Sequence, residues 1–154
     1  MTRRTVMLGA ASLVLLGTAA GIAFYFWGAR AEGRLLKPDD RALVTAGADI
    51  YSEHCASCHG VNLEGEADWQ RRKPDGKLPA PPHNETGHTW HHDDATLFAV
   101  TKYGTAKAAN LDGYESEMPI YDGVLDDEEI VAVLSFIKST WPATIRERHD
   151  RLGE

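Results

Sequence analysis

The chain has 154 residues, enough for one modest domain and a short additional segment. Residues 1–30 contain three of the 16 lysine and arginine residues and none of the 23 aspartate and glutamate residues, so residues 31–154 carry a net charge of −10. A surface of this sign repels nucleic acid and anionic lipid, which argues against binding to either and favours a partner with a basic face.

The first 30 residues are predicted to form a transmembrane anchor. The 25 residues from Thr5 to Ala29 carry no charged side chain, and as a helix they would span about 37 Å, more than the roughly 30 Å of a bilayer's hydrocarbon core. Arg3 and Arg4 precede this run, which places the N-terminus in the cytoplasm by the positive-inside rule. A cleaved signal peptide is the alternative, although its apolar region is usually only about 7–15 residues long. Both interpretations export the remainder of the chain.

The exported part is predicted to be all-α. Residues 31–40 are predicted to form a tether, and a first helix is predicted over about 40–56 because apolar residues recur there at helical spacing. A long loop rich in glycine and proline follows, and long loops in small domains are usually functional. A short helix is predicted over about 94–103, ended by Gly104.

The last predicted helix has the clearest boundaries. Asp126 and Glu129 have the spacing of a capping box, and Leu125 and Ile130 have that of a hydrophobic staple. Pro142 is expected to end the helix. No stretch of the sequence alternates convincingly as a strand.

The predicted domain organisation follows from these elements. Residues 41–142 are expected to form a small domain of about three to four helices, followed by a polar C-terminal tail at 143–154. So few helices joined by long loops leave a thin core, which a group other than polypeptide would fill.

Both cysteines of the chain lie in the segment HCASCHG, residues 54–60. At the end of a helix, Cys55, Cys58 and His59 occupy positions i, i+3 and i+4 and face the same way. A disulfide would be permitted by export but would leave His59 unexplained. A redox-active dithiol normally begins a helix after a strand, whereas this pair follows a helix.

A metal site and a covalent haem also fit two thiols and an imidazole on one side of a helix. Zinc needs about four ligands, and no second C-x-x-C is present, although the loop histidines His83, His88, His91 and His92 could complete the set. C-x-x-C-H is also the haem attachment signature, in which two thiols bond to the haem vinyl groups and the histidine reaches the iron. Met118 is the only methionine outside the N-terminal segment. It can fill a gap in the core, or it can supply the second axial ligand.

The sequence resembles class I cytochrome c, the small monohaem family with His/Met ligation, from about Gly47 to Trp141. The stretch GADIYSEHCASCHG is similar to the first helix of the family, and EMPIYDGVLDDEEIVAVLSFIKSTWP to its axial Met-Pro and C-terminal helix. The resemblance implies one covalently bound haem c and a close crossing of the two helices, with Gly47 against the face from Phe136 to Trp141. The residues that it assigns to the haem are Cys55 and Cys58 for attachment and His59 and Met118 as axial ligands.

The resemblance also implies a proline carbonyl that accepts a hydrogen bond from the axial histidine. The matching stretch is LPAPPH, in which Pro81 is favoured over Pro82 and His83 stands where the family usually has an apolar residue. Trp90 is a candidate for contact with a haem propionate, or for shielding the haem edge.

Two further features bear on partners and metals. Residues 108–137 contain eight acidic residues and no basic one, which argues against docking through a lysine ring and favours a basic partner surface. The histidines of HNETGHTWHH can form a second site, for copper or zinc, or can lie solvated on the surface.

The sequence therefore predicts a membrane-anchored monohaem c-type cytochrome with its haem domain in the bacterial periplasm, held by a single pass through the inner membrane. It is expected to carry electrons from a quinol-oxidising donor to a terminal oxidase or reaction centre, without a substrate site of its own. A haem sensor or haem enzyme with a labile Met118, a copper-handling protein, and a subunit fixed within a larger respiratory complex are the competing interpretations.

Overall fold

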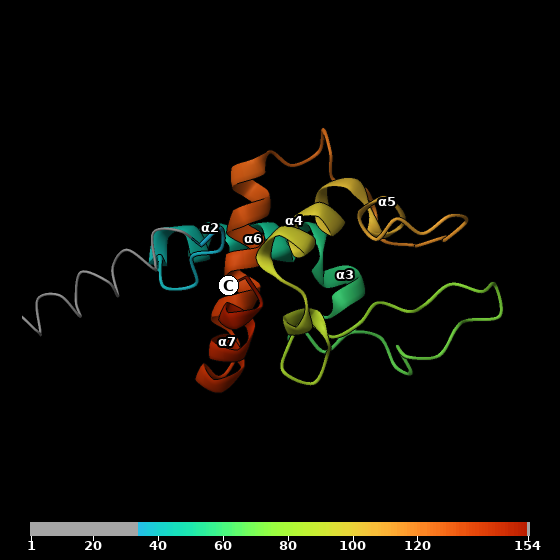
Figure 1. The fold of residues 1–154 in the computed structure, drawn as a ribbon, viewed down its shortest axis with the longest axis horizontal. Helices are drawn as coiled ribbons and strands as arrows, with labels where there is room; N and C mark the ends of the chain where they lie inside the picture. Colours follow the sequence, from blue (N-terminus) through green and yellow to red (C-terminus); the bar gives the residue numbers. More distant parts are fainter. Residues whose placement is uncertain (1–33, 154) are drawn as a thin grey trace, which may run out of the picture. The chain divides into compact units, whose positions relative to one another are not determined.

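In the computed structural model of the chain, residues 34–153 are described (Figure 1). The predicted anchor at 1–30 lies outside this range and stays a prediction. Within the described range, none of the helices has the length and apolar character needed to cross a membrane. The compact unit formed by these residues begins at Leu35.

The prediction of an all-α domain is confirmed for residues 34–153. Apart from one isolated bridge between Asp122 and Leu125, all regular structure in that range is helical. The helices, in chain order, are α2 (Arg41–His54), α3 (Ala56–His59), the 3₁₀ turn η1 (Thr89–His91), α4 (Asp94–Tyr103), α5 (Thr105–Ala108), α6 (Asp127–Ser139), α7 (Ala143–Asp150) and the 3₁₀ turn η2 (Arg151–Gly153). Helices α2, α4 and α6 occupy the predicted positions, whereas α7 lies in the segment predicted only as a polar tail.

The segment before α2 is part of the folded unit. Leu36 is only 1% exposed, and its N–H donates to Asp94 Oδ2 at 3.1 Å. The N–H of Lys37 donates to Ser135 Oγ at 2.9 Å. The structure therefore differs from the predicted tether at 31–40, because one leucine and two backbone hydrogen bonds attach this segment to α4 and α6.

The N-terminus of α6 is fixed by the predicted capping box. Asp126 Oδ1 accepts from the N–H of Glu129 at 2.9 Å, and Glu129 Oε2 accepts from the N–H of Asp126 at 2.8 Å. Leu125 and Ile130, the predicted staple pair, are both buried. These contacts satisfy backbone donors that a helix end leaves without intrahelical partners. They therefore fix the residue at which α6 begins, a short distance along the chain after Met118.

Replacing Asp126 with alanine is expected to lower the free energy of unfolding by about 1 kcal/mol, because both halves of the capping box depend on that residue. Urea unfolding followed by circular dichroism measures the change. Glu128→Ala removes an exposed carboxylate from the same turn and is the matched control. The capping role is contradicted if the two substitutions have equal effects.

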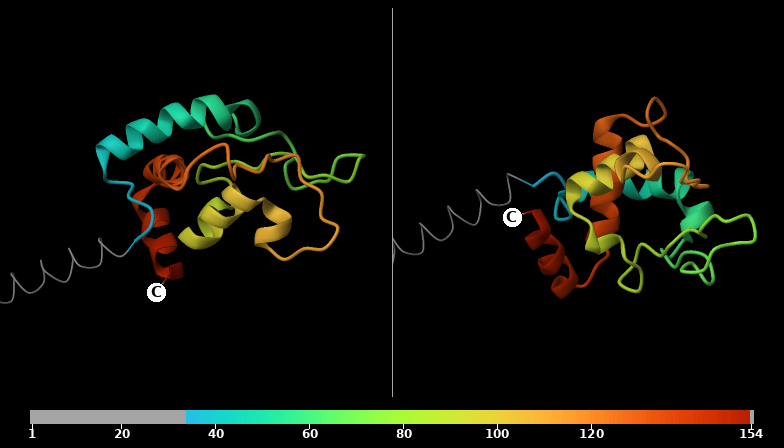
Figure 2. Two further views of the ribbon diagram at one scale, coloured as in Figure 1. Left: turned by 90° about the horizontal axis from the view of Figure 1, so that it is seen from above. Right: turned by 45° about the vertical axis from the view of Figure 1, so that its right-hand side comes forward.

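Helices α2 and α6 cross in close contact (Figure 2). Gly47 lies at the crossing, where a Cβ atom would overlap the Ala132 carbonyl oxygen and fall 2.9 Å from Phe136 Cβ. One turn further along α2, the Tyr51 ring packs on Phe136 with ring centroids 5.4 Å apart. The absence of a side chain at Gly47 therefore allows the two backbones to touch, and this crossing positions the end of α2.

Helix α7 packs onto the domain through a buried charged cluster, and of its apolar side chains Ile145 contacts the hydrophobic core. Lys138 on α6 is 1% exposed, and its Nζ lies 2.7 Å from Asp150 Oδ1 and 3.4 Å from Asp94 Oδ1. Burial lowers the pKa of the neighbouring His149, so Lys138 supplies the positive charge. The cluster connects α4, α6 and α7, and its charged composition explains why hydrophobic periodicity did not predict α7.

Candidate haem-binding site

The C-x-x-C-H segment joins the end of α2 to the single turn α3. Cys55 ends α2 and begins α3, and its carbonyl accepts from the N–H of His59 at 2.9 Å. Neither cysteine forms a disulfide, and Cys55 is half-buried while Cys58 is exposed. Both thiols are therefore available to bond to another group.

The structure does not favour a redox-active dithiol or a zinc site here. Burial raises the pKa of the Cys55 thiol to about 11, whereas a reactive dithiol needs a lowered value. The pair also follows a helix rather than a strand. Within residues 34–153, no group of three or more histidine, cysteine, aspartate or glutamate side chains is arranged to hold a metal ion.

His59 is held in the protonation state that binds a metal. Its ring is 8% exposed, and Nδ1 donates to the Pro81 carbonyl oxygen at 2.8 Å. Because a carbonyl oxygen only accepts, Nδ1 carries the proton and Nε2 keeps its lone pair. Burial is the main cause that lowers the pKa of His59, so the ring is neutral. A neutral, oriented imidazole of this kind fits an axial position on haem iron.

Of the two candidate prolines, Pro81 makes the contact that the resemblance implies. The Pro82 carbonyl faces a different partner, Thr89 Oγ1, at 3.4 Å. Tyr121 and Tyr51 support the attachment segment from two sides: the Tyr121 hydroxyl donates to the His54 carbonyl at 2.6 Å, and the Tyr51 hydroxyl donates to the Gly60 carbonyl at 2.9 Å. Sequence reasoning missed the Tyr121 contact, since nothing in the sequence connects residues so far apart.

His83 lies directly against the candidate ligand. Its ring stacks on that of His59 with centroids 3.9 Å apart, and its Nδ1 lies 2.8 Å from Thr89 Oγ1. Burial lowers the pKa of His83 well below its ordinary value, so the ring is neutral. At the position where the family usually has an apolar residue, this chain therefore has a flat polar ring, that of His83, stacked on the face of the His59 ring.

Met118 and Trp90 lie in segments separate from α3. Met118 is partly buried against the hydrophobic core, and its N–H donates to Ser116 Oγ at 3.1 Å. The Trp90 indole N–H donates to the Glu85 carbonyl at 3.3 Å, and Arg148 lies 4.9 Å above its ring. Ligation by Met118 and propionate contact by Trp90 stay predictions.

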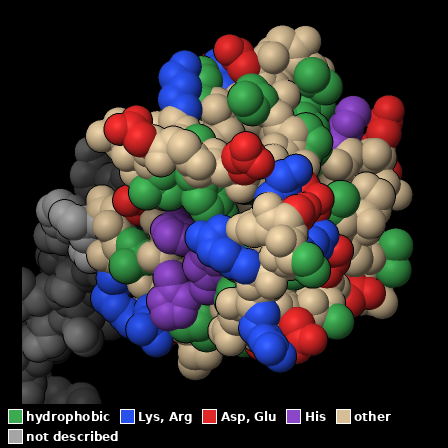
Figure 3. All heavy atoms as spheres, turned by 90° about the vertical axis from the view of Figure 1, so that its right-hand side faces the viewer, with side chains coloured by type: hydrophobic (Ala, Val, Ile, Leu, Met, Phe, Trp, Pro, Cys, Tyr) green, Lys and Arg blue, Asp and Glu red, His purple; other side chains and the backbone are tan. Residues whose placement is uncertain are grey.

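The loop histidines contact aromatic rings and one another, and the His88 and His92 ring centroids lie 5.3 Å apart. The His88 ring stacks on Trp69 at 5.2 Å, and the His91 ring stacks on Trp90 at 3.7 Å. Histidine side chains gather on part of one face of the molecule (Figure 3), and His91 and His92 are exposed. This part of the described structure offers solvated, ring-stacked histidines rather than a cluster around one point.

The cytochrome c family model matches residues 44–141. The chain belongs to the cytochrome c family and is a class I c-type cytochrome, a class that binds haem c covalently. The matched range includes most of α2, the C-x-x-C-H segment, the loops that carry Pro81 and Met118, and α6. No solved structure gives a significant match.

Several curated proteins are similar to part of the chain. The cytochrome bc1 complex cytochrome c subunit of Corynebacterium efficiens is 39% identical over 66 residues, 43% of this chain and 22% of that protein. A nitrite reductase of Stutzerimonas stutzeri is 32% identical over 101 residues, 62% of this chain and 15% of that protein. The Cbb3-type cytochrome c oxidase subunit FixP of Rhizobium etli is 26% identical over 94 residues, 61% of this chain and 29% of that protein. The chain therefore spans less than a third of the length of each of these relatives.

Proposed function

We propose that this chain is a membrane-anchored monohaem cytochrome c that carries single electrons between redox complexes facing the bacterial periplasm. The observation that carries the proposal is the state of His59, a buried neutral imidazole oriented by the Pro81 carbonyl and preceded by two free thiols. One haem is expected because the whole chain has only two cysteines. The periplasmic location is proposed from the sequence of the N-terminal segment, because a membrane anchor and a cleaved signal peptide would both export the domain.

When bound, haem supplies the one-electron chemistry. Cys55 and Cys58 would hold it covalently, and His59 and Met118 would bind its iron. Pro81 keeps the proton of His59 on Nδ1 and so leaves the lone pair of Nε2 available to bind the iron. Binding of the iron by both His59 and Met118 would leave no position on it for a substrate, and for this reason we propose an electron carrier rather than an enzyme.

The partners are proposed from the relatives and from the charge. Two of the relatives are named as subunits of a cytochrome bc1 complex and of a Cbb3-type oxidase. We infer a quinol-oxidising donor and a terminal oxidase or reaction centre as acceptor, each with a basic docking face because residues 108–137 are acidic. A variant of this proposal makes the chain a permanent subunit of one such complex. A short link between the predicted anchor and the domain fits this variant as well as it fits a separate carrier.

A haem enzyme or sensor is the second candidate, favoured by the similarity to part of a nitrite reductase. The two candidates differ in the role of Met118. In a carrier, Met118 would bind the iron stably, whereas in an enzyme or sensor it would bind weakly or not at all and leave that coordination position to another ligand.

The optical spectrum of the haem-loaded full chain separates the candidates. We expect a low-spin haem with the weak far-red band of methionine bound to ferric iron, and no response of the reduced protein to carbon monoxide. Met118→Leu keeps the side-chain volume and should abolish the band and admit carbon monoxide, while Ile120→Leu, an exposed residue of the same segment, should change neither. Carbon monoxide binding by the wild type would instead identify a sensor or enzyme.

A further inference from the structure

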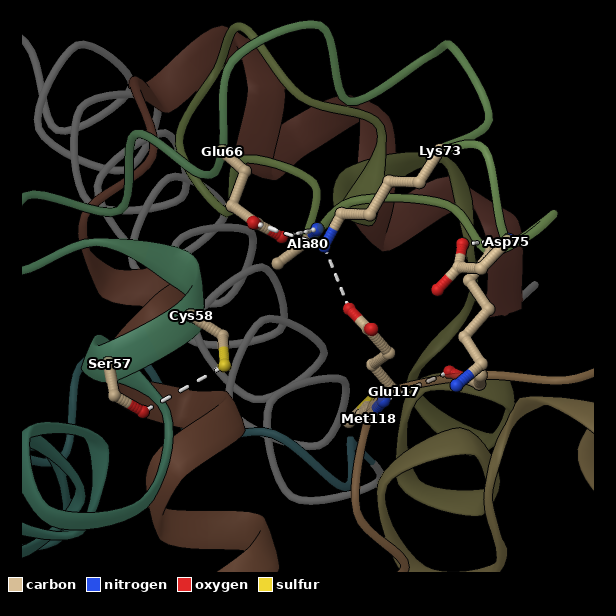
Figure 4. A network of polar contacts seen from close by, with 10 residues as sticks. Ser57, Cys58, Glu66, Lys73, Asp75, Ala80, Glu117 and Met118 are labelled. Carbon is tan, nitrogen blue, oxygen red and sulfur yellow. Dashed lines mark hydrogen bonds and ion pairs between the residues drawn. The ribbon is translucent and has the colours of Figure 1, made fainter.

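Lys73 bridges two acidic residues from different loops (Figure 4). Its Nζ lies 2.8 Å from Glu117 Oε2 and 3.3 Å from Glu66 Oε1. The Lys73 side chain is 31% exposed, and those of Glu66 and Glu117 are 41% and 45% exposed. Glu117 precedes Met118, so the bridge ends one residue from the proposed axial methionine.

The other end of the same network reaches the loop of the axial histidine. Glu66 Oε2 accepts from the N–H of Ala80 at 2.6 Å, and the carbonyl of the next residue, Pro81, accepts from His59 Nδ1. Hydrogen bonding to Ala80 is the main cause that lowers the pKa of Glu66, which keeps this carboxylate ionised. The network therefore connects the segment on the His59 side with the segment on the Met118 side.

Apart from the packing of Met118 against the hydrophobic core, the segment that carries Met118 has few polar contacts with the rest of the domain. We name residues 112–120 the methionine loop; in the described structure they form no backbone–backbone hydrogen bond to another element. The Met118 N–H is bonded within the loop, to Ser116. A second contact comes from the residue next to Lys73, because Arg72 lies 5.8 Å from the ring centroid of Tyr114. Adjacent basic residues thus hold the methionine loop at two points.

We propose that Lys73 acts as a latch that keeps the methionine loop against the loop of Pro81 and so keeps Met118 in place. The proposal rests on the proposed function, because it takes Met118 as the axial ligand. Lys73 is a positioning residue that acts on Met118 through Glu117. Its charges are partly exposed, so salt weakens the latch, and each pair contributes modestly.

Imidazole binding to the ferric, haem-loaded full chain tests the latch, because imidazole has to displace Met118 to reach the iron. Disappearance of the far-red band reports the displacement. At low salt, Lys73→Gln is expected to tighten imidazole binding about two- to fivefold, the range measured for partly exposed ion pairs. At about 1 M salt, where the screening length falls to roughly 3 Å, wild type and variant should converge.

Two further variants control for charge and for folding. Lys77→Gln removes the same charge from the same loop and should leave imidazole binding unchanged. The exchange Lys73→Glu with Glu117→Lys restores an opposite pair and should bring back most of the wild-type resistance to imidazole that Lys73→Glu alone loses.

Equal imidazole affinity of wild type and Lys73→Gln at low salt, with the far-red band present in both, overturns the latch and leaves the proposed function intact. A wild type without that band overturns the proposed function and the latch with it. An effect of Lys77→Gln as large as that of Lys73→Gln also overturns the latch, because it would assign the effect to net charge alone.

Discussion

Replacing Gly47 with alanine is expected to destabilise the domain by about 2 kcal/mol, although alanine is the better helix former. An alanine Cβ at this position would fall 2.5 Å from the Ala132 carbonyl carbon and closer still to its oxygen. Both atoms are backbone, so helices α2 and α6 would have to separate. Overpacking of this kind costs about 3 kcal/mol, of which the higher helix propensity of alanine returns about 1 kcal/mol.

The neighbouring residue provides the control for Gly47. Ala46 is exposed on the same turn of α2, and Ala46→Gly should cost about 1 kcal/mol through helix propensity alone. Opposite exchanges at adjacent positions should therefore both destabilise the haem-loaded protein in urea unfolding. If Gly47→Ala raises stability by about 1 kcal/mol, as propensity alone predicts, then the close approach of the two helices is contradicted.

The second large effect is expected at Lys138. Lys138→Met keeps the volume of the side chain but removes the ammonium group that lies between the carboxylates of Asp94 and Asp150. Breaking a buried ion pair costs about 3–5 kcal/mol, and we expect the lower end, about 3 kcal/mol. The reason is that both carboxylates retain 19% side-chain exposure and can draw on some solvent.

Thermal unfolding of the haem-loaded protein measures this loss, and a second substitution tests its cause. Lys138→Met combined with Asp150→Asn removes one of the two carboxylate charges and should recover part of the lost stability. Lys37→Met, at an exposed lysine, should change stability by less than about 0.5 kcal/mol. If the double variant is no more stable than Lys138→Met alone, then repulsion between the carboxylates is not the cause.

The sequence predicted those helices whose boundaries depend on local signals. The start of α6 follows from residues three apart, Asp126 and Glu129, and the end of α4 follows from Gly104 at its C-terminus. The sequence did not predict α7, because the helix is held to the domain by Lys138 and His149. Both are residue types that are usually exposed, so nothing in the sequence indicated that they are buried. The burial of Leu36 was not predicted either, because one buried leucine in a largely polar segment does not produce a periodic hydrophobic pattern.

In the candidate site, too, the sequence predicted the residues that lie close together along the chain but missed some contacts between distant ones. The attachment cysteines and His59 lie within five positions, so their common purpose can be read from spacing. The stack of His83 on His59 and the bridge from Lys73 to Glu117 join residues 24 and 44 positions apart. Pairings at such separations depend on how the loops fold over one another, and one sequence does not contain that information.

The plane of the His59 imidazole is fixed at one edge by the Pro81 carbonyl and on one face by the His83 ring. Electron transfer is slowed by every atom that has to move when the charge of a redox centre changes. As the proposed ligand, a ring that is already held in position has little freedom to turn when an electron arrives, so it adds little to the reorganisation energy. We therefore expect the protein around the proposed haem to move little between the two oxidation states, which favours fast electron transfer.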